Sequence, residues 1–200
     1  MTARTTPGTE DFATCLHLVQ AAATGGIDLV QIREKNLPAR VLYELATKAV
    51  ALTAGTGTNL LINDRADVAA AAGAAGVHLT TKSLPAEIVR SAFGADFVIG
   101  VSTHSIEEAT AARQQGADFV VFGPVFPTAS KSEYGEPQGV AKLRQVCGAL
   151  APFPVLALGG ITSSNVADCL EAGAHGIAAI GMFDDPLRLR ETVSKIRGTF

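Results

Sequence analysis

Short apolar runs alternate with longer alanine-rich stretches along this chain, and that alternation constrains the fold more than any other feature. The runs are almost continuously apolar, which is typical of strands covered on both faces of a parallel sheet. Strict alternation of strand and helix forces parallel strands with right-handed crossovers, in a closed barrel or an open doubly wound sheet. We predict an α/β fold, a TIM (β/α)8 barrel, with strands at Asp28–Ile32, Asn59–Ile62, Gly76–Leu79, Phe97–Val101, Asp118–Phe122, Pro154–Leu158 and Gly176–Ile180.

The helical stretches carry recognisable start and stop signals. Ser105 precedes Glu108 by three residues, which is a capping-box pattern. Gly73, Gly116 and Gly173 follow helical patterns, where glycine supplies a left-handed C-cap before the next strand. The predicted helices are Glu10–Thr24, Pro38–Thr53, Ala66–Ala72, Leu84–Phe93, Ser105–Gln115, Val140–Leu150, Ser163–Ala172 and Pro186–Arg197.

The beginning of the chain does not fit a regular barrel, because a helix precedes the first recognisable strand. Met1–Thr9 is polar and makes a poor central strand. We therefore expect a single domain over residues 1–200 that lacks a regular first strand. Either the natural protein begins upstream of Met1, or residues 1–9 drape irregularly over the gap.

Composition excludes several classes of protein. The chain is 48% hydrophobic and 18% charged, which favours a large core over disorder. The net charge of −3 gives no basic face for nucleic acid or anionic membranes, and no stretch reaches the roughly 20 apolar residues of a membrane span. Three widely spaced cysteines suggest neither a disulfide framework nor a metal site and favour the cytoplasm. No nucleic-acid or membrane partner is expected, and a homo-oligomer stays open.

Two inward-facing cations follow the first predicted strand. Gln31, Arg33 and Lys35 alternate along the chain and would line a barrel interior. Burying two cations is costly unless an anion meets them, so the pattern indicates an anionic ligand. The alternative is a surface ion-pair network with Glu34 and Asp64.

Polar residues also follow the next strands. Asn63 and Asp64 follow the second strand, where a carboxylate would suit Mg²⁺ shared with a diphosphate. The alternative role for Asp64 is an N-cap for the helix at Ala66. His78 ends the third strand and fits a core position, while Ser102 and two further polar residues follow the fourth.

The last three strands are followed by a long loop and two glycine turns. Thr128, Ser130 and Lys131 offer two hydroxyls and an ammonium for an oxyanion, although a solvated loop would have the same composition. Glycines after the last two strands of a barrel let backbone N–H groups approach a phosphate. These turns contain Gly159, Gly160, Ile180 and Gly181.

In these motifs the sequence resembles the thiamine-phosphate synthase and TenI-like thiazole tautomerase superfamily. The resemblance runs from about Gly25 to Phe183 and is specific through the order and spacing of its pieces. They are Gln31–Lys35, Ile62–Asp67, Gly76–Leu79, Ile99–Ser102, Gly116–Phe119, Gly123–Thr128 with Lys131, and Ala157–Ile161.

The resemblance implies a transferase reaction. Hydroxymethylpyrimidine diphosphate loses Mg²⁺-bound pyrophosphate, and the nitrogen of thiazole phosphate attacks the resulting cation to give thiamine phosphate. By family analogy Asp64 binds the metal, and the catalytic residues are Arg33, Lys35, Lys131 and Ser102. By the same analogy the substrate-binding residues are Gln31, Asn63, Thr128, Ser130, Gly159, Gly160, Ile180 and Gly181.

Two departures from the family pattern bear on the activity. Ser83 stands where synthases usually carry a second metal-binding aspartate, and Lys82 beside it could replace part of the lost charge. Pro124 stands where the tautomerase branch commonly carries histidine, and Asp64 is kept, so the pattern favours a synthase. The alternatives are a TenI-like thiazole tautomerase and an inactive phosphate-ligand-binding barrel.

Overall fold

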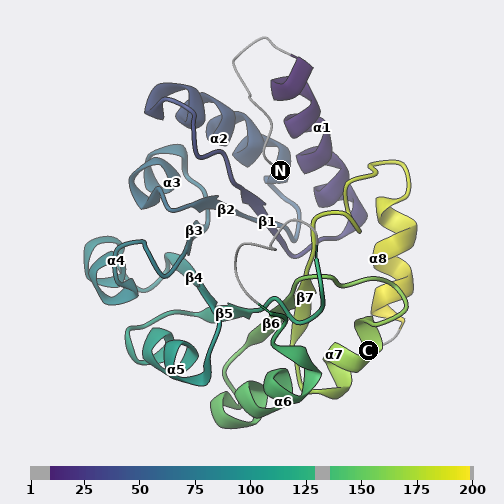
Figure 1. Ribbon diagram of the computed structural model, residues 1–200. Helices are drawn as coiled ribbons and strands as arrows, with labels where there is room; N and C mark the ends of the chain where they lie inside the picture. Colours follow the sequence, from purple (N-terminus) through teal and green to yellow (C-terminus); the bar gives the residue numbers. More distant parts are fainter. Residues whose placement is uncertain (1–9, 129–135, 199–200) are drawn as a thin grey trace. The chain divides into compact units, whose positions relative to one another are not determined.

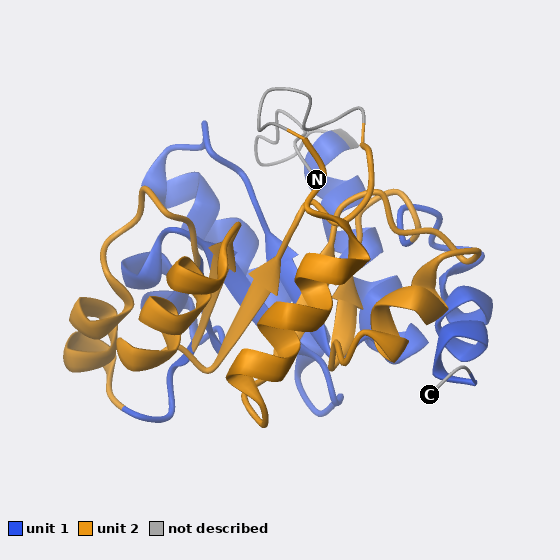
Figure 2. Ribbon diagram, turned by 60° about the horizontal axis from the view of Figure 1, so that its bottom comes forward, with its two compact units in different colours: residues 1–78, 95–98, 183–198 blue, residues 79–94, 99–182, 199–200 orange. Residues whose placement is uncertain are grey.

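The computed structural model describes residues 10–128 and 136–198, which fall into two compact units (Figure 2). Unit 1 comprises the described parts of residues 1–78, 95–98 and 183–198, and unit 2 comprises those of residues 79–94 and 99–182. Unit 1 contains α1 (Glu10–Gly25), β1 (Leu29–Ile32), α2 (Ala39–Thr53), β2 (Asn59–Asn63), α3 (Ala66–Ala72), β3 (Gly76–Leu79) as far as His78, and α8 (Leu189–Arg197).

The strands of unit 1 form a parallel ladder in chain order. Ile32 pairs with Ile62, and Ile62 pairs with Val77, so these three side chains share one face of the ladder. All three are at most 3% exposed, as expected of the face that helices cover. The opposite face carries polar side chains at the carboxyl ends of the strands, among them Asn63 and His78.

Helix α1 packs beside α2 and α8 in unit 1 (Figure 1). Ala22 of α1 contributes to a buried cluster with Leu189 and Val193 of α8. Arg190 and Arg197 of α8 reach back to the backbone carbonyls of Thr24 and Gly26 at 3.1 and 2.7 Å. These contacts fix the last helix against the first, far apart in the sequence.

Unit 2 repeats the same architecture. Its strands are β4 (Val98–Thr103) from Ile99 onward, β5 (Phe119–Phe122), β6 (Val155–Leu158) and β7 (Gly176–Ala178), all parallel and in chain order. Val120, Phe122, Val155 and Ala157 share a fully buried face. The helices are α4 (Ala86–Phe93), α5 (Ile106–Gln114), α6 (Gly139–Leu150) and α7 (Val166–Glu171).

The alternating elements and chain-order parallel strands confirm the predicted α/β class of TIM-like type. Residues 1–9, for which we predicted an irregular path, lie outside the described part of the chain. The single domain over residues 1–200 stays a prediction. Within the described ranges, no helix is both long and apolar enough to cross a membrane.

The helix signals in the sequence are confirmed with one difference. Ser105 Oγ accepts a hydrogen bond from the Glu108 N–H at 3.1 Å, as the capping box requires. The Glu108 carboxylate, however, accepts from the backbone N–H of His104 at 2.6 Å instead of that of Ser105. Gly73, Gly116 and Gly173 all have positive φ angles at helix ends.

Candidate active site

In unit 1 the polar ends of β1 and β2 meet through their side chains. Gln31 Nε2 donates a hydrogen bond to Asn63 Oδ1 at 3.0 Å. Gln31 lies opposite Leu61 in the parallel ladder, so Gln31, Leu61 and Asn63 project from the same face. The structure therefore brings together two of the residues that the family resemblance implies bind substrate.

Asp64 follows β2 in a left-handed conformation, with φ of 63°. Its N–H donates to the His78 carbonyl at 2.9 Å, which ties the turn to the end of β3. A non-glycine residue in this region is uncommon and costs of order 1 kcal/mol or more, so such residues often mark functional sites. The Asp64 side chain itself is exposed.

The alternative role of Asp64 as a helix cap is wrong. The N-cap of α3 is Arg65, whose side chain makes no capping hydrogen bond. Arg65 instead forms a two-point ion pair with Asp67, at 2.8 and 2.7 Å. Hydrogen bonding from Arg65 lowers the pKa of Asp67. Asp64 is not the N-cap residue of α3.

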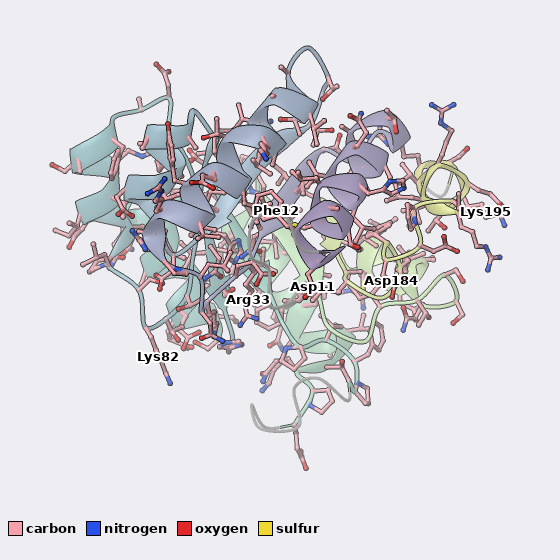
Figure 3. The ribbon with its side chains drawn as sticks, turned by 90° about the horizontal axis from the view of Figure 1, so that it is seen from above. Asp11, Phe12, Arg33, Lys82, Asp184 and Lys195 are labelled. Atoms are coloured by element: carbon pink, nitrogen blue, oxygen red, sulfur yellow. The ribbon has the colours of Figure 1, made fainter. Side chains whose placement is uncertain are left out.

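The two predicted cations lie beyond the end of β1. Arg33 is half-buried directly after the strand, and Lys35 is exposed in a turn. Arg33 therefore lies close to the strand ends. By contrast, Lys195 of α8, a cation with no predicted role in the site, projects outward (Figure 3). The alternation predicted to run through Lys35 stops at the strand end, since Lys35 belongs to the turn.

The loop after β3, in unit 2, holds Ser83 by local bonds. Ser83 Oγ accepts from the Thr80 N–H at 2.8 Å and lies 3.0 Å from Thr80 Oγ1. Its hydroxyl thus closes a short turn. Lys82 in the same turn is exposed.

The end of β4 is tied to the segment after β5. His104 Nδ1 hydrogen-bonds the carbonyl of Gly123, and the Gly123 N–H donates to the Thr103 carbonyl at 3.2 Å. Ser102 is partly exposed, while Thr103 faces the helix layer with Phe122. Thr103 Oγ1 is buried and has no hydrogen-bond partner among the described residues.

The segment Gly123–Thr128 lies along the end of β6. The N–H groups of Val125 and Phe126 donate to the carbonyls of Leu158 and Gly159 at 2.8 and 3.0 Å. Thr128 is partly exposed at the end of this segment. Ser130 and Lys131 lie outside the described residues, so their expected roles stay predictions.

The glycine turn after β6 is organised by a residue to which the sequence analysis gave no role. Asn165 Nδ2 donates to the Gly160 carbonyl at 3.0 Å, and its Oδ1 accepts from the Thr162 N–H at 2.8 Å. Ile180 and Gly181, after β7, are both exposed in a turn. The cluster of Thr, Ser and Asn directly after the glycines is the sequence signal for such a turn.

The donor set suits a metal ion only if the substrate contributes ligands. The described residues contain no group of three His, Cys, Asp or Glu side chains placed to hold a metal. Asp64 offers one exposed carboxylate, and Asn63 Oδ1 already accepts from Gln31. Mg²⁺ is often held by one or two carboxylates together with substrate phosphates, so Asp64 fits a shared site and not a protein cage.

Parallel α/β folds of this type carry enzyme active sites at the carboxyl ends of their strands, where the polar residues described above lie. The profile of the thiamine monophosphate synthase family matches residues 5–183. The chain belongs to this family. It is an enzyme of the transferase class, and thiamine-phosphate synthase, the function predicted from the sequence, is confirmed.

Relatives and a solved structure agree with this assignment. The chain is 40% identical to the thiamine-phosphate synthase of Moorella thermoacetica, over 92% of this chain and 90% of the relative. It is 43% identical to that of Methanoculleus marisnigri, over 82% and 77%. The structure resembles thiamine phosphate pyrophosphorylase from Pyrococcus furiosus with a TM-score of 0.83 and 30% identity, covering all of this chain and 94% of the other.

Proposed function

We propose that the strand-end residues carry the synthase reaction on two phosphorylated substrates. The observation that carries this assignment is the hydrogen bond between Gln31 and Asn63, together with Asp64, which follows Asn63 in the sequence and is exposed. An amide pair suits the polar edge of a pyrimidine, and the neighbouring carboxylate suits a metal bound to its diphosphate. Gln31 and Ser102 would contact the pyrimidine, and Asn63 would contact the diphosphate.

In this reaction the protein would position the two substrates and stabilise the negative charge of the leaving pyrophosphate. The bond between the pyrimidine methylene carbon and the diphosphate oxygen breaks, and pyrophosphate leaves with the electron pair. The thiazole nitrogen then donates its lone pair to the methylene cation and forms the new C–N bond. Arg33, Lys35 and Lys131 would stabilise the leaving charge, which needs no protein nucleophile.

Mg²⁺ is the proposed cofactor. When bound, it would neutralise part of the negative charge that develops on pyrophosphate. Asp64 would be its protein ligand. Ser83, whose hydroxyl is engaged by Thr80, would add no charge to the site.

The thiazole phosphate would bind to residues of unit 2. Thr128 and Ser130 would face the thiazole, and its phosphate would rest on the backbone of the two glycine turns. Glycine turns suit this role because no side chain keeps the phosphate from the N–H groups. The residues of these turns are Gly159, Gly160, Ile180 and Gly181.

One assay tests the proposal. Thiamine phosphate should form from both substrates in the presence of Mg²⁺, and pyrophosphate should appear in equal amount. Thermal unfolding gives a second readout, because the pyrimidine diphosphate should stabilise the protein only with Mg²⁺. Stabilisation by thiazole phosphates alone, without product formation, would contradict the proposal and favour a tautomerase.

We also propose that the protein works in the cytoplasm on small molecules, without nucleic acid or membrane partners. Cys15, Cys147 and Cys169 are all free and buried, which suits a reducing compartment. Cell fractionation checks the location. Size-exclusion chromatography with light scattering decides whether the protein forms a homo-oligomer.

A further inference from the structure

The turn after β6 has both of its glycine carbonyls held by the protein. The Phe126 N–H donates to the Gly159 carbonyl at 3.0 Å. Asn165 Nδ2 donates to the Gly160 carbonyl, also at 3.0 Å. The orientation of two successive peptide planes is therefore fixed from outside the turn.

Fixed carbonyls determine where the matching N–H groups point. In a trans peptide the C=O and the N–H of one plane point in opposite directions, and neither glycine peptide is among the cis bonds of the structure. The N–H of Gly160 therefore points away from Phe126, and the N–H of Ile161 points away from Asn165. Two neighbouring donors are thus aimed away from the residues that hold the turn.

The turn also has no room for side chains at its glycines. A Cβ on Gly159 would lie 2.6 Å from Pro124 Cβ, and a Cβ on Gly160 would lie 2.5 Å from the Pro127 carbonyl. Both glycines have positive φ angles, of 100° and 64°. The backbone is therefore packed closely against the segment Gly123–Thr128.

We propose that Asn165 is a positioning residue that, by holding the Gly160 carbonyl, directs the Ile161 N–H at the phosphate of the thiazole substrate. This inference rests on the proposed function. Asn165 acts through the backbone, since its Nδ2 is bonded to Gly160 and its Oδ1 to Thr162. A carboxamide suits this task because it carries a donor and an acceptor on one short side chain.

Three variants separate this role from general support of the fold. Asn165→Ala removes both bonds, and Asn165→Asp keeps an acceptor for the Thr162 N–H but loses the donor to Gly160. Ser164→Ala is the matched control, because it removes a neighbouring bond in the same turn, between Ser164 Oγ and Thr162 Oγ1 at 2.8 Å. Each variant is assayed with thiazole phosphate and with the dephosphorylated thiazole alcohol.

Both Asn165 variants should raise KM for thiazole phosphate about tenfold, the effect of one lost well-placed hydrogen bond. KM for the alcohol, KM for the pyrimidine diphosphate and kcat should stay within about twofold, so the preference for the phosphate falls. Ser164→Ala should keep that preference. Equal losses with phosphate and alcohol, or an unchanged preference in both Asn165 variants, would overturn the proposal.

The wild-type assay keeps this inference separate from the proposed function. If the wild type forms no thiamine phosphate, the proposed function fails, and calorimetric binding of thiazole phosphate and its alcohol then decides the role of Asn165. Weaker binding of the phosphate alone in Asn165→Asp supports the inference. Equal binding of phosphate and alcohol by the wild type overturns it.

Discussion

Gln31 Nε2 and Asn63 Oδ1 are 3.0 Å apart, and this bond joins the ends of two neighbouring parallel strands. This bond uses the donor half of the Gln31 amide and the acceptor half of the Asn63 amide. Removing either partner should therefore release the amide of the other.

Gln31→Ala should raise KM for the pyrimidine diphosphate about tenfold, because a direct contact is lost and Asn63 loses its partner. KM for thiazole phosphate should change little. Steady-state kinetics with each substrate varied in turn measures both values. Gln20→Ala, which changes an exposed glutamine of α1, is the control, and equal effects of the two variants would remove Gln31 from the site.

Under the proposed function, Lys131→Ala should lower kcat about tenfold or more without unfolding the protein, since its ammonium would contribute charge that stabilises the leaving group. Lys142→Ala on α6 is the matched control, because its ammonium pairs with Gln138 at 3.0 Å on the surface. Turnover and the thermal midpoint are compared for both variants. Unchanged kinetics in Lys131→Ala would exclude that residue from the reaction.

The Mg²⁺ requirement should depend on Asp64 and be weak for lack of a second carboxylate. Asp64→Ala should raise the Mg²⁺ concentration for half-maximal rate by about tenfold or more. Ser83→Asp should lower it, because an aspartate keeps an acceptor for the Thr80 N–H and adds a charge. Mg²⁺ titrations of the reaction rate and of pyrimidine diphosphate binding measure this concentration. An unchanged Mg²⁺ dependence in Asp64→Ala would mean that the ion is held elsewhere.

The three thiols should be unreactive in the folded protein at pH 8. Burial raises the pKa values of Cys15, Cys147 and Cys169 from the ordinary 9.0 to about 11, so little thiolate is present. A chromogenic disulfide reagent should label them only in denaturant. Rapid labelling of the native protein would contradict the burial seen here.

The same shifts predict an alkaline loss of stability. The folded state holds these protons more tightly than the unfolded state, so the stabilisation is complete below pH 9 and is lost as the pH rises from 9 to about 11. Urea midpoints should fall across this range. Replacing the cysteines with alanine should reduce the slope.

The order of elements was predictable because β-branched runs and glycine caps are strong local signals. The helix Ala66–Ala72 and the strand Gly76–Leu79 have the predicted bounds. The last two helices begin three residues later than predicted, at Val166 and Leu189. Side chain to backbone bonds from Asn165 and Asp185 hold turns there that compete with the helix.

The candidate site could be proposed from the sequence as a set of strand-end residues, but its geometry could not. The sequence placed Gln31 and Asn63 at strand ends, yet the bond between them depends on a register that periodicity does not specify. Asn165 was assigned to a helix, since its contact with Gly160 exists only after the turn has formed. The left-handed Asp64 gave no sequence signal, because most residues with φ near 60° are glycines.

The main-chain donors of the turn after β6 have a consequence for enzyme redesign. A library at residues 159–161 cannot delete these N–H groups unless it introduces proline, and larger residues at the two glycines would clash with the neighbouring loop. Selection for a substrate without phosphate should therefore yield changes outside the turn, at Asn165 or along Gly123–Thr128, where the carbonyls of the turn are anchored. Under the proposed function, the preference of this turn for a phosphate is set by the residues that hold its carbonyls.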